Sequence, residues 1–169
     1  MAGRPGPRAY LTLGTVAFGA VDTLRRSLPE SAEVCGQVLV AAGPKADLSA
    51  LGTLPDNVRV ERSVHQPSVL DDVHVAIQHG GTGTLLACLA VGVPQVVTPQ
   101  GGHQFMNADQ LARLDLGVVV HNDAPAGSVA AAVRRALSNE PLHARVAAIC
   151  AEIAGMPSPD DVIETLTHR

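Results

Sequence analysis

The chain has 169 residues, of which 46% are hydrophobic and only 2% aromatic, so one domain must build its core from Ala, Val and Leu. Its formal net charge of −4, without any run of Lys or Arg, excludes a surface built for nucleic acid. No stretch is apolar for long enough to span a membrane, and the three cysteines lack the spacing of a metal site or a disulfide framework. We therefore expect a soluble protein of the cytoplasm.

Continuous apolar runs separated by turn residues predict strands that alternate with helices. In chain order we expect strand 8–15, helix 21–28, strands 36–43, 57–64 and 73–80, helix 82–91, strand 94–99, helix 104–115, strand 117–121, and helices 126–138, 141–154 and 159–167. This alternation predicts an α/β fold, a doubly wound, Rossmann-like parallel sheet of about six strands with helices on both faces.

Residues 1–7 contain two prolines and two glycines and are interpreted as a tail or linker. Residues 8–169 are expected to form the single domain. The opening segment resembles an interdomain linker more than the start of a natural chain, which favours a piece of a longer enzyme.

Ligands of doubly wound sheets bind outside the carboxyl ends of the strands. The loops at 14–19, 64–68, 79–84 and 100–107 follow predicted strands and concentrate polar residues and glycine. We expect the ligand site to be built from these loops.

The segment HGGTGT at residues 79–84 joins a predicted strand to a predicted helix. Its glycines allow close backbone approach, and a helix N-terminus attracts anions, so the pattern favours a diphosphate site. Thr82 is expected to cap the helix, while His79 and Thr84 offer donors to phosphate oxygens. A tight turn with a buried histidine and no ligand would use the same residues, and spacing alone leaves both interpretations open.

Residues 79–120 resemble the donor-binding segment of glycosyltransferases that have two Rossmann-like domains, the GT-B type. The resemblance is nearest to bacterial enzymes that glycosylate natural products such as macrolides and enediynes, which are related to the UDP-glycosyltransferases. It rests on HGGxGT, GVPQ, PQGxxQ and NA in that order, and it extends from residues 10–19 to residues 152–166. It corresponds only to the C-terminal half of such an enzyme.

The resemblance implies that two loops hold the diphosphate of a nucleotide-sugar, with the histidine contacting a phosphate and the glycine-rich turn wrapping the diphosphate. These positions are Gly14, Thr15, His79, Gly81, Thr82, Gly83 and Thr84.

The resemblance also implies which residues contact the base and the sugar of the donor. Val64 would offer backbone groups to a pyrimidine and Gln66 would lie near the base and ribose, while His103 and Gln104 would contact the sugar hydroxyls. Ser63 departs from the family pattern, because an aromatic residue usually stacks on the base there.

Two further departures concern histidines. His65 replaces the usual proline, and His103 replaces the usual acidic residue, so a permanent anionic acceptor for the sugar is missing. The aromatic ring that is missing at Ser63 would be a lost stacking partner for the base, which costs about 1–3 kcal/mol of binding free energy. Both the identity of the sugar and the choice between thymidine and uridine therefore stay open.

The resemblance implies a donor-binding domain of an inverting glycosyltransferase, with a TDP-sugar as the first expectation and a UDP-sugar as the second. The acceptor, a small natural-product aglycone, and the general base would belong to an N-terminal domain, so we assign no catalytic residue to this chain. No metal and no cofactor besides the nucleotide-sugar donor are expected. Two alternatives remain: a stand-alone nucleotide-sugar-binding subunit that needs a partner chain, and a nucleotide-sugar epimerase, for which these loops lack the acid–base carboxylates.

Overall fold

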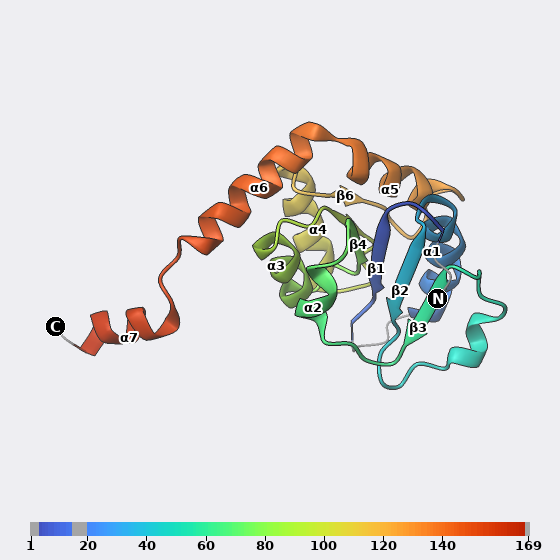
Figure 1. Ribbon diagram of the computed structural model, residues 1–169, viewed down its shortest axis with the longest axis horizontal. Coiled ribbons are helices and arrows are strands. Elements are labelled where there is room, and N and C mark those ends of the chain that lie inside the picture. The colour runs from blue at the N-terminus through green and yellow to red at the C-terminus, as the bar shows by residue number, and fades with distance from the viewer. Residues whose placement is uncertain (1–3, 15–19, 168–169) are drawn as a thin grey trace.

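The computed structural model describes residues 4–14 and 20–167. The strands alternate with helices along most of the chain, and two helices end it (Figure 1). In chain order the elements are β1 (Arg8–Thr12), α1 (Ala20–Val34), β2 (Gln37–Ala41), the 3-10 helix η1 (Leu48–Leu51), β3 (Val58–Glu61), α2 (Gln66–Leu70), β4 (Val75–Gln78), α3 (Thr82–Ala90), β5 (Gln95–Val97), α4 (His103–Arg113), β6 (Val118–Val119), α5 (Ser128–Ser138), α6 (Glu140–Ala154) and α7 (Pro159–Thr167).

The strands form one six-stranded sheet in the order β3-β2-β1-β4-β5-β6, and every neighbouring pair is parallel. The order reverses between β1 and β4, which is the switch point at which Rossmann-like sheets bind ligands. The predicted doubly wound α/β fold is confirmed.

Alternate residues of the strands point to opposite faces of the sheet, and each face has its own apolar core. Leu11 and Ile77 pack with α1 and α5 on one face, whereas Tyr10 and Ala76 pack with α2 and α3 on the other. Next to this second core, α4 and α6 cover the β5–β6 side of the sheet. Both faces are thus apolar, as the continuous hydrophobic runs predicted.

Several predicted boundaries were wrong. The first helix does not end at residue 28 but runs through Pro29 to Val34, because Ala32 and Leu28 are both buried in the core. The third strand ends at Glu61 rather than at Val64. The short helices η1 and α2 were not predicted at all, since four or five residues are too few to show a helical period.

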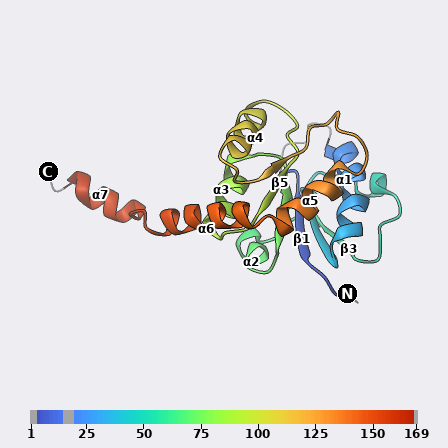
Figure 2. The ribbon, with the colours of Figure 1, turned by 90° about the horizontal axis from the view of Figure 1, so that it is seen from above.

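The last helix, α7, projects away from the sheet in both views (Figures 1 and 2). All residues from 154 to 167 are exposed, including the apolar side chains of Val162, Ile163 and Leu166. Among the helices of the described residues, none combines the length and the apolar character that a bilayer crossing requires.

Candidate functional site

Three loops meet at the carboxyl edge of the sheet around the ring of His79. This residue directly follows β4, and its ring lies between the backbones of Gly14 and Gly81. A Cβ atom added to Gly14 would lie 2.7 Å from both Cε1 and Nε2 of the ring, and Gly14 has a φ of +75°. Glycine is therefore needed at position 14 for two reasons, a left-handed backbone and contact with the imidazole.

His79 is held as a largely neutral imidazole. Burial lowers its pKa below the usual value and outweighs an interaction with the Thr12 backbone that acts in the opposite direction, and a still smaller electrostatic effect of His103 also lowers the pKa. The ring nitrogen Nδ1 is buried and has no partner at good hydrogen-bond geometry among the described residues. The opposite edge of the ring, formed by Cε1 and Nε2, is the one that lies against the backbones of Gly14 and Gly81.

A small cavity of about 190 Å³ is lined by Gly14, whose backbone contacts the His79 ring, although His79 itself is not among the lining residues. Four of the predicted contact positions line it, and β1, the end of β2 and the loop after β3 complete its wall. Its lining residues are Tyr10, Thr12, Gly14, Ala41, Gly43, Pro44, Arg62, Ser63, Val64, Gln66 and Thr84. Residues of the predicted base-binding loop and Thr84 of the predicted phosphate-binding turn thus line the same cavity.

A hydrogen-bonded pair joins these two sides. Gln66, the first residue of α2, donates from Nε2 to Oγ1 of Thr84 in α3 over 3.3 Å. The hydroxyl of Tyr10 interacts with the side chains of Thr12 and Gln66, and burial raises the pKa of this tyrosine. The buried tyrosine therefore helps to orient Gln66 from the floor of the cavity.

The N-terminus of α3 faces the site without a side-chain cap. Gly81 is the N-cap, with φ of −67° and ψ of +133°, and as a glycine it has no side chain that could accept a hydrogen bond from the N–H groups of the first turn. The prediction that Thr82 caps this helix was wrong, because Thr82 already lies inside α3 and its hydroxyl accepts a hydrogen bond of 3.2 Å from Asn107. Gly83 has no atom within 4 Å of an added Cβ, so its side of the turn is open.

Buried amides that we did not predict hold the glycine-rich turn in place. Oε1 of Gln78 accepts a hydrogen bond from the N–H of Gly80, and Nε2 of Gln78 donates to Oε1 of Gln95 over 3.0 Å. From the other side, Asn107 donates to the carbonyl of Gly80 over 2.7 Å. Their signal in the sequence was a glutamine inside each of two otherwise apolar strands.

The predicted sugar-binding pair lies in a third loop. His103 is the exposed first residue of α4, but Gln104 is buried, and its Oε1 accepts hydrogen bonds of 2.7 and 3.3 Å from the N–H groups of Gln100 and Gly101. The amide oxygen of Gln104 therefore shapes the loop that would hold the sugar. Gln100 extends this loop to α1 by accepting a hydrogen bond of 2.7 Å from Thr23.

Thr15 lies outside the described residues, so its predicted contact stays a prediction. Within residues 4–14 and 20–167, no three His, Cys, Asp or Glu side chains gather as they would around a metal ion. Burial raises the pKa of Cys35 to about 11 and that of Cys88 to about 12, so neither thiol is an activated nucleophile.

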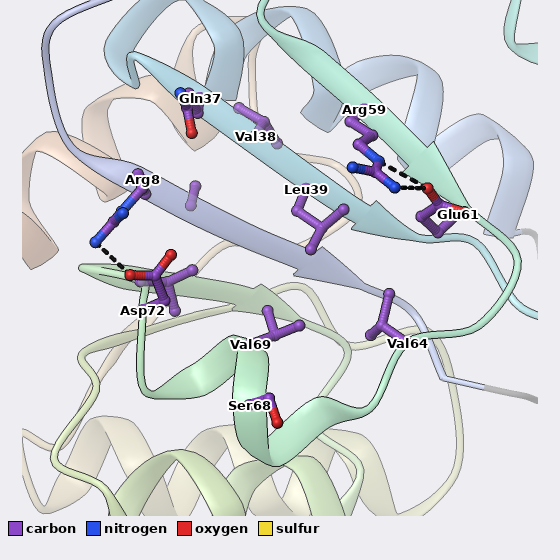
Figure 3. Close-up of a pocket in the computed structure, with 12 residues that line it drawn as sticks. Arg8, Gln37, Val38, Leu39, Arg59, Glu61, Val64, Ser68, Val69 and Asp72 are labelled. Atoms are coloured by element: carbon purple, nitrogen blue, oxygen red, sulfur yellow. Dashed lines mark hydrogen bonds and ion pairs between the residues drawn. The ribbon is translucent and has the colours of Figure 1, made fainter. Parts of the chain in front are cut away.

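A second, more apolar cavity of about 330 Å³ lies elsewhere, between α2 and the open face of β1, β2 and β3 (Figure 3). Of the predicted site residues it includes only Val64. Its charged groups neutralise each other, since Arg8 pairs with Asp72 and Arg59 pairs with Glu61, each at 2.6 Å. Despite its greater volume, this cavity offers a diphosphate neither glycine backbone nor an open helix end, and the smaller cavity is the better candidate.

Comparison with known proteins connects this geometry to one group of enzymes. Residues 25–168 match the family model described as "Erythromycin biosynthesis protein CIII-like, C-terminal domain". The chain is 36% identical to the elloramycin glycosyltransferase ElmGT of Streptomyces olivaceus, over 96% of this chain and 41% of that protein. Against the curated relatives it matches, the chain thus spans less than half their length.

Solved structures agree. The glycosyltransferase SnogD from Streptomyces nogalater is 34% identical, with a TM-score of 0.83 over 99% of this chain and 45% of that one. The Streptomyces sp. SF2575 glycosyltransferase SsfS6, solved in complex with thymidine diphosphate, is 29% identical, with a TM-score of 0.76 over 98% of this chain and 42% of that one. The resemblance identified from the motifs is confirmed, and the chain belongs to the family of erythromycin biosynthesis protein CIII-like C-terminal domains.

Proposed function

We propose that this chain binds the nucleotide-sugar donor of a natural-product glycosyltransferase, with the diphosphate at the N-terminus of α3 and the base in the cavity beside it. The observation that carries the proposal is the place of the His79 ring, whose Nε2 edge lies against Gly81, the N-cap of that helix, which has no side chain to cap it. A preorganised group of donors at this place would bind the diphosphate and stabilise it as a leaving group. Because SsfS6 was solved with thymidine diphosphate bound, TDP is the first ligand to test.

The binding test compares two histidines at opposite ends of one strand. His79 follows β4 at the carboxyl edge, whereas His74 precedes it at the amino edge, where its Nδ1 accepts a hydrogen bond from the N–H of Arg8. A charge-assisted hydrogen bond contributes about 1.5–3 kcal/mol, so His79→Ala is expected to weaken TDP binding by about 10- to 150-fold in calorimetry. His74→Ala should bind as the parent does. Equal affinities of His79→Ala and the parent would contradict the proposal.

We further propose that the chain transfers no sugar by itself. Transfer requires an acceptor hydroxyl held against the anomeric carbon and a base near its proton, and such positioning accounts for about 7–11 kcal/mol of a barrier. In this proposal a further domain supplies both, together with the pocket for a small aglycone, and the inverting course of the reaction is part of the same proposal. Glycosylated product from this chain alone, detected by mass spectrometry with TDP- or UDP-sugars and a panel of aglycones, would overturn it.

The three cysteines are free, and two of them are buried in the apolar cores. Reduced thiols of this kind are typical of proteins in the cytoplasm, and we propose that location for the chain. Fractionation of cells that express the full gene product would test it.

A further inference from the structure

We propose that the guanidinium group of Arg62 is the stacking platform for the pyrimidine base, in place of the aromatic side chain that is missing at position 63. This inference rests on the proposed function and adds to it a residue that recognises the base.

The positions of Arg62 and Ser63 support this assignment. Both line the cavity of about 190 Å³, together with Val64, the residue expected to contact the base through its backbone. Ser63 is exposed and offers no planar surface, whereas Arg62 carries a planar, delocalised group. Nucleobases stack on arginine planes as well as on aromatic rings.

The guanidinium of Arg62 is already held in place. Its Nη1 donates hydrogen bonds of 2.9 Å to the carbonyl of Ala46 and 3.3 Å to that of Pro44. Pro44 is itself part of the cavity wall. Hydrogen bonds to the edge of a guanidinium lie in its plane and leave its two faces free, so a base can stack without losing them.

The charge of Arg62 is also available, in contrast to that of two other arginines. Arg8 and Arg59 form ion pairs at the second cavity (Figure 3), but within the described residues no carboxylate lies within ion-pair distance of Arg62. Asp47 forms no ion pair with Arg62 and has only a weak electrostatic interaction with it. Its Oδ1 accepts hydrogen bonds from the N–H and the hydroxyl of Ser49, and these bonds are the main reason that the pKa of Asp47 lies below its usual value. An unpaired cation beside a base site gains from the π face of the base.

Arg62 could instead serve only to join the loop after β2 to the loop after β3, and two substitutions separate these roles. Arg62→Lys keeps the charge and a donor for the two carbonyls but loses the plane, whereas Arg62→Trp loses the charge and those hydrogen bonds but presents a larger plane. Calorimetry with TDP and with inorganic pyrophosphate then reports the base and the phosphate contributions separately. Thermal unfolding of each variant reports whether the substitution destabilises the contact between these two loops.

Stacking predicts that Arg62→Lys weakens TDP binding by about 5- to 30-fold, in the lower part of the range for a lost base stack, and changes pyrophosphate binding by less than about twofold. Arg62→Trp should bind TDP at least as tightly as the parent. Arg59→Lys, at a position within β3 that lines the second cavity and not the smaller one, is the control and should match the parent with both ligands.

Three results would overturn the inference. In the first, Arg62→Lys keeps the TDP affinity of the parent while Arg62→Trp loses it, which indicates a role in holding the loop. In the second, both variants lose TDP and pyrophosphate equally and unfold at lower temperature. In the third, the parent chain binds neither ligand, which would overturn the proposed function as well, so the two failures are distinguishable.

Discussion

Two helix N-termini on the same sheet are treated in opposite ways. The N-terminus of α5 is filled by Glu30 of α1, whose Oε1 accepts a hydrogen bond from Gly127 at 2.9 Å and whose Oε2 accepts from Val129 and Ala130 at 2.8 and 3.1 Å. The N-terminus of α3 also begins after a glycine, but in the described part of the chain neither a capping side chain nor an acidic residue occupies its first turn.

In the proposed function, this difference separates a helix end that holds the fold together from a helix end that binds a ligand. The free N–H groups and the dipole of a helix N-terminus attract negative charge wherever they occur. At α5 the chain supplies that charge from within and uses it to fix α1 against α5. At α3 it supplies a neutral histidine and glycines instead, which leaves the positive end of the helix for an anion from outside. Substitutions that fill, empty or distort one of these two ends test the distinction.

The largest effect is expected from distorting the open end with Gly14→Ala. The added Cβ would lie 2.7 Å from the His79 ring and displace it, so TDP binding should fall by about 100-fold or more, since more than one donor is lost. Gly52→Ala is the matched control, because Gly52 has a similar φ of +71° but no atom within 4 Å of an added Cβ. Both variants should lose stability, measured by urea unfolding, because alanine rarely adopts a positive φ. Equal TDP affinities of the two variants would show that the contact between Gly14 and His79 does not matter for binding.

Emptying the filled end with Glu30→Ala is expected to lower the free energy of unfolding by about 2–3 kcal/mol, because three N–H groups lose a charged acceptor. Glu30→Gln should lose less, since its amide oxygen still accepts. The neighbouring Glu33 pairs with Arg134 on the surface, so Glu33→Ala should cost less than about 1 kcal/mol in the same urea titration. If Glu30→Ala and Glu33→Ala were equally stable, the α5 end would not be a structural site.

Gly83→Asp would place a negative charge at the open N-terminus of α3. It is expected to stabilise the fold but to weaken TDP binding. The position has room for a side chain, and a carboxylate in the first turn of α3 would stabilise the helix by about 0.3–1 kcal/mol through its dipole. The same charge would repel a diphosphate and weaken TDP binding by about tenfold, or 1.4 kcal/mol. Gly83→Ala, the control, should gain stability without losing affinity. Unchanged TDP affinity in Gly83→Asp would place the diphosphate elsewhere.

The smallest effect concerns the pH dependence of stability. Because burial lowers the pKa of His79 in the folded state, the unfolded chain binds more protons at this residue, and its contribution to stability is lost as the pH falls below about 6.5. His79→Gln removes this contribution, so its free energy of unfolding should fall less steeply than that of the parent between pH 7 and pH 5. Parallel curves for the two proteins would mean that the imidazole is not held neutral.

Local patterns were sufficient to predict the fold class and the strand that leads into the glycine-rich turn. The residues 75–78 and 95–97 are apolar enough to be recognised as buried strands, and HGGTGT marks the junction to α3. The same patterns failed at α2 and at the C-terminal part of α1, where a short helix and an internal proline hide the period. They also placed the cap of α3 one residue too late.

The sequence by itself determined the alternation of strands and helices, the place of the glycine-rich turn and the family, because each depends on residues close together in the chain. Only the tertiary structure decided that His79 lies between Gly14 and Gly81, that Glu30 closes α5, and that Arg62 lines the cavity beside Ser63. These contacts join residues that lie far apart in the chain, in different loops and helices. The direction of a side chain at the end of a strand also depends on how the parallel strands pair, which local patterns do not show. The packing of these loops and helices therefore decided which polar groups face the proposed ligand site and which ones hold the fold together.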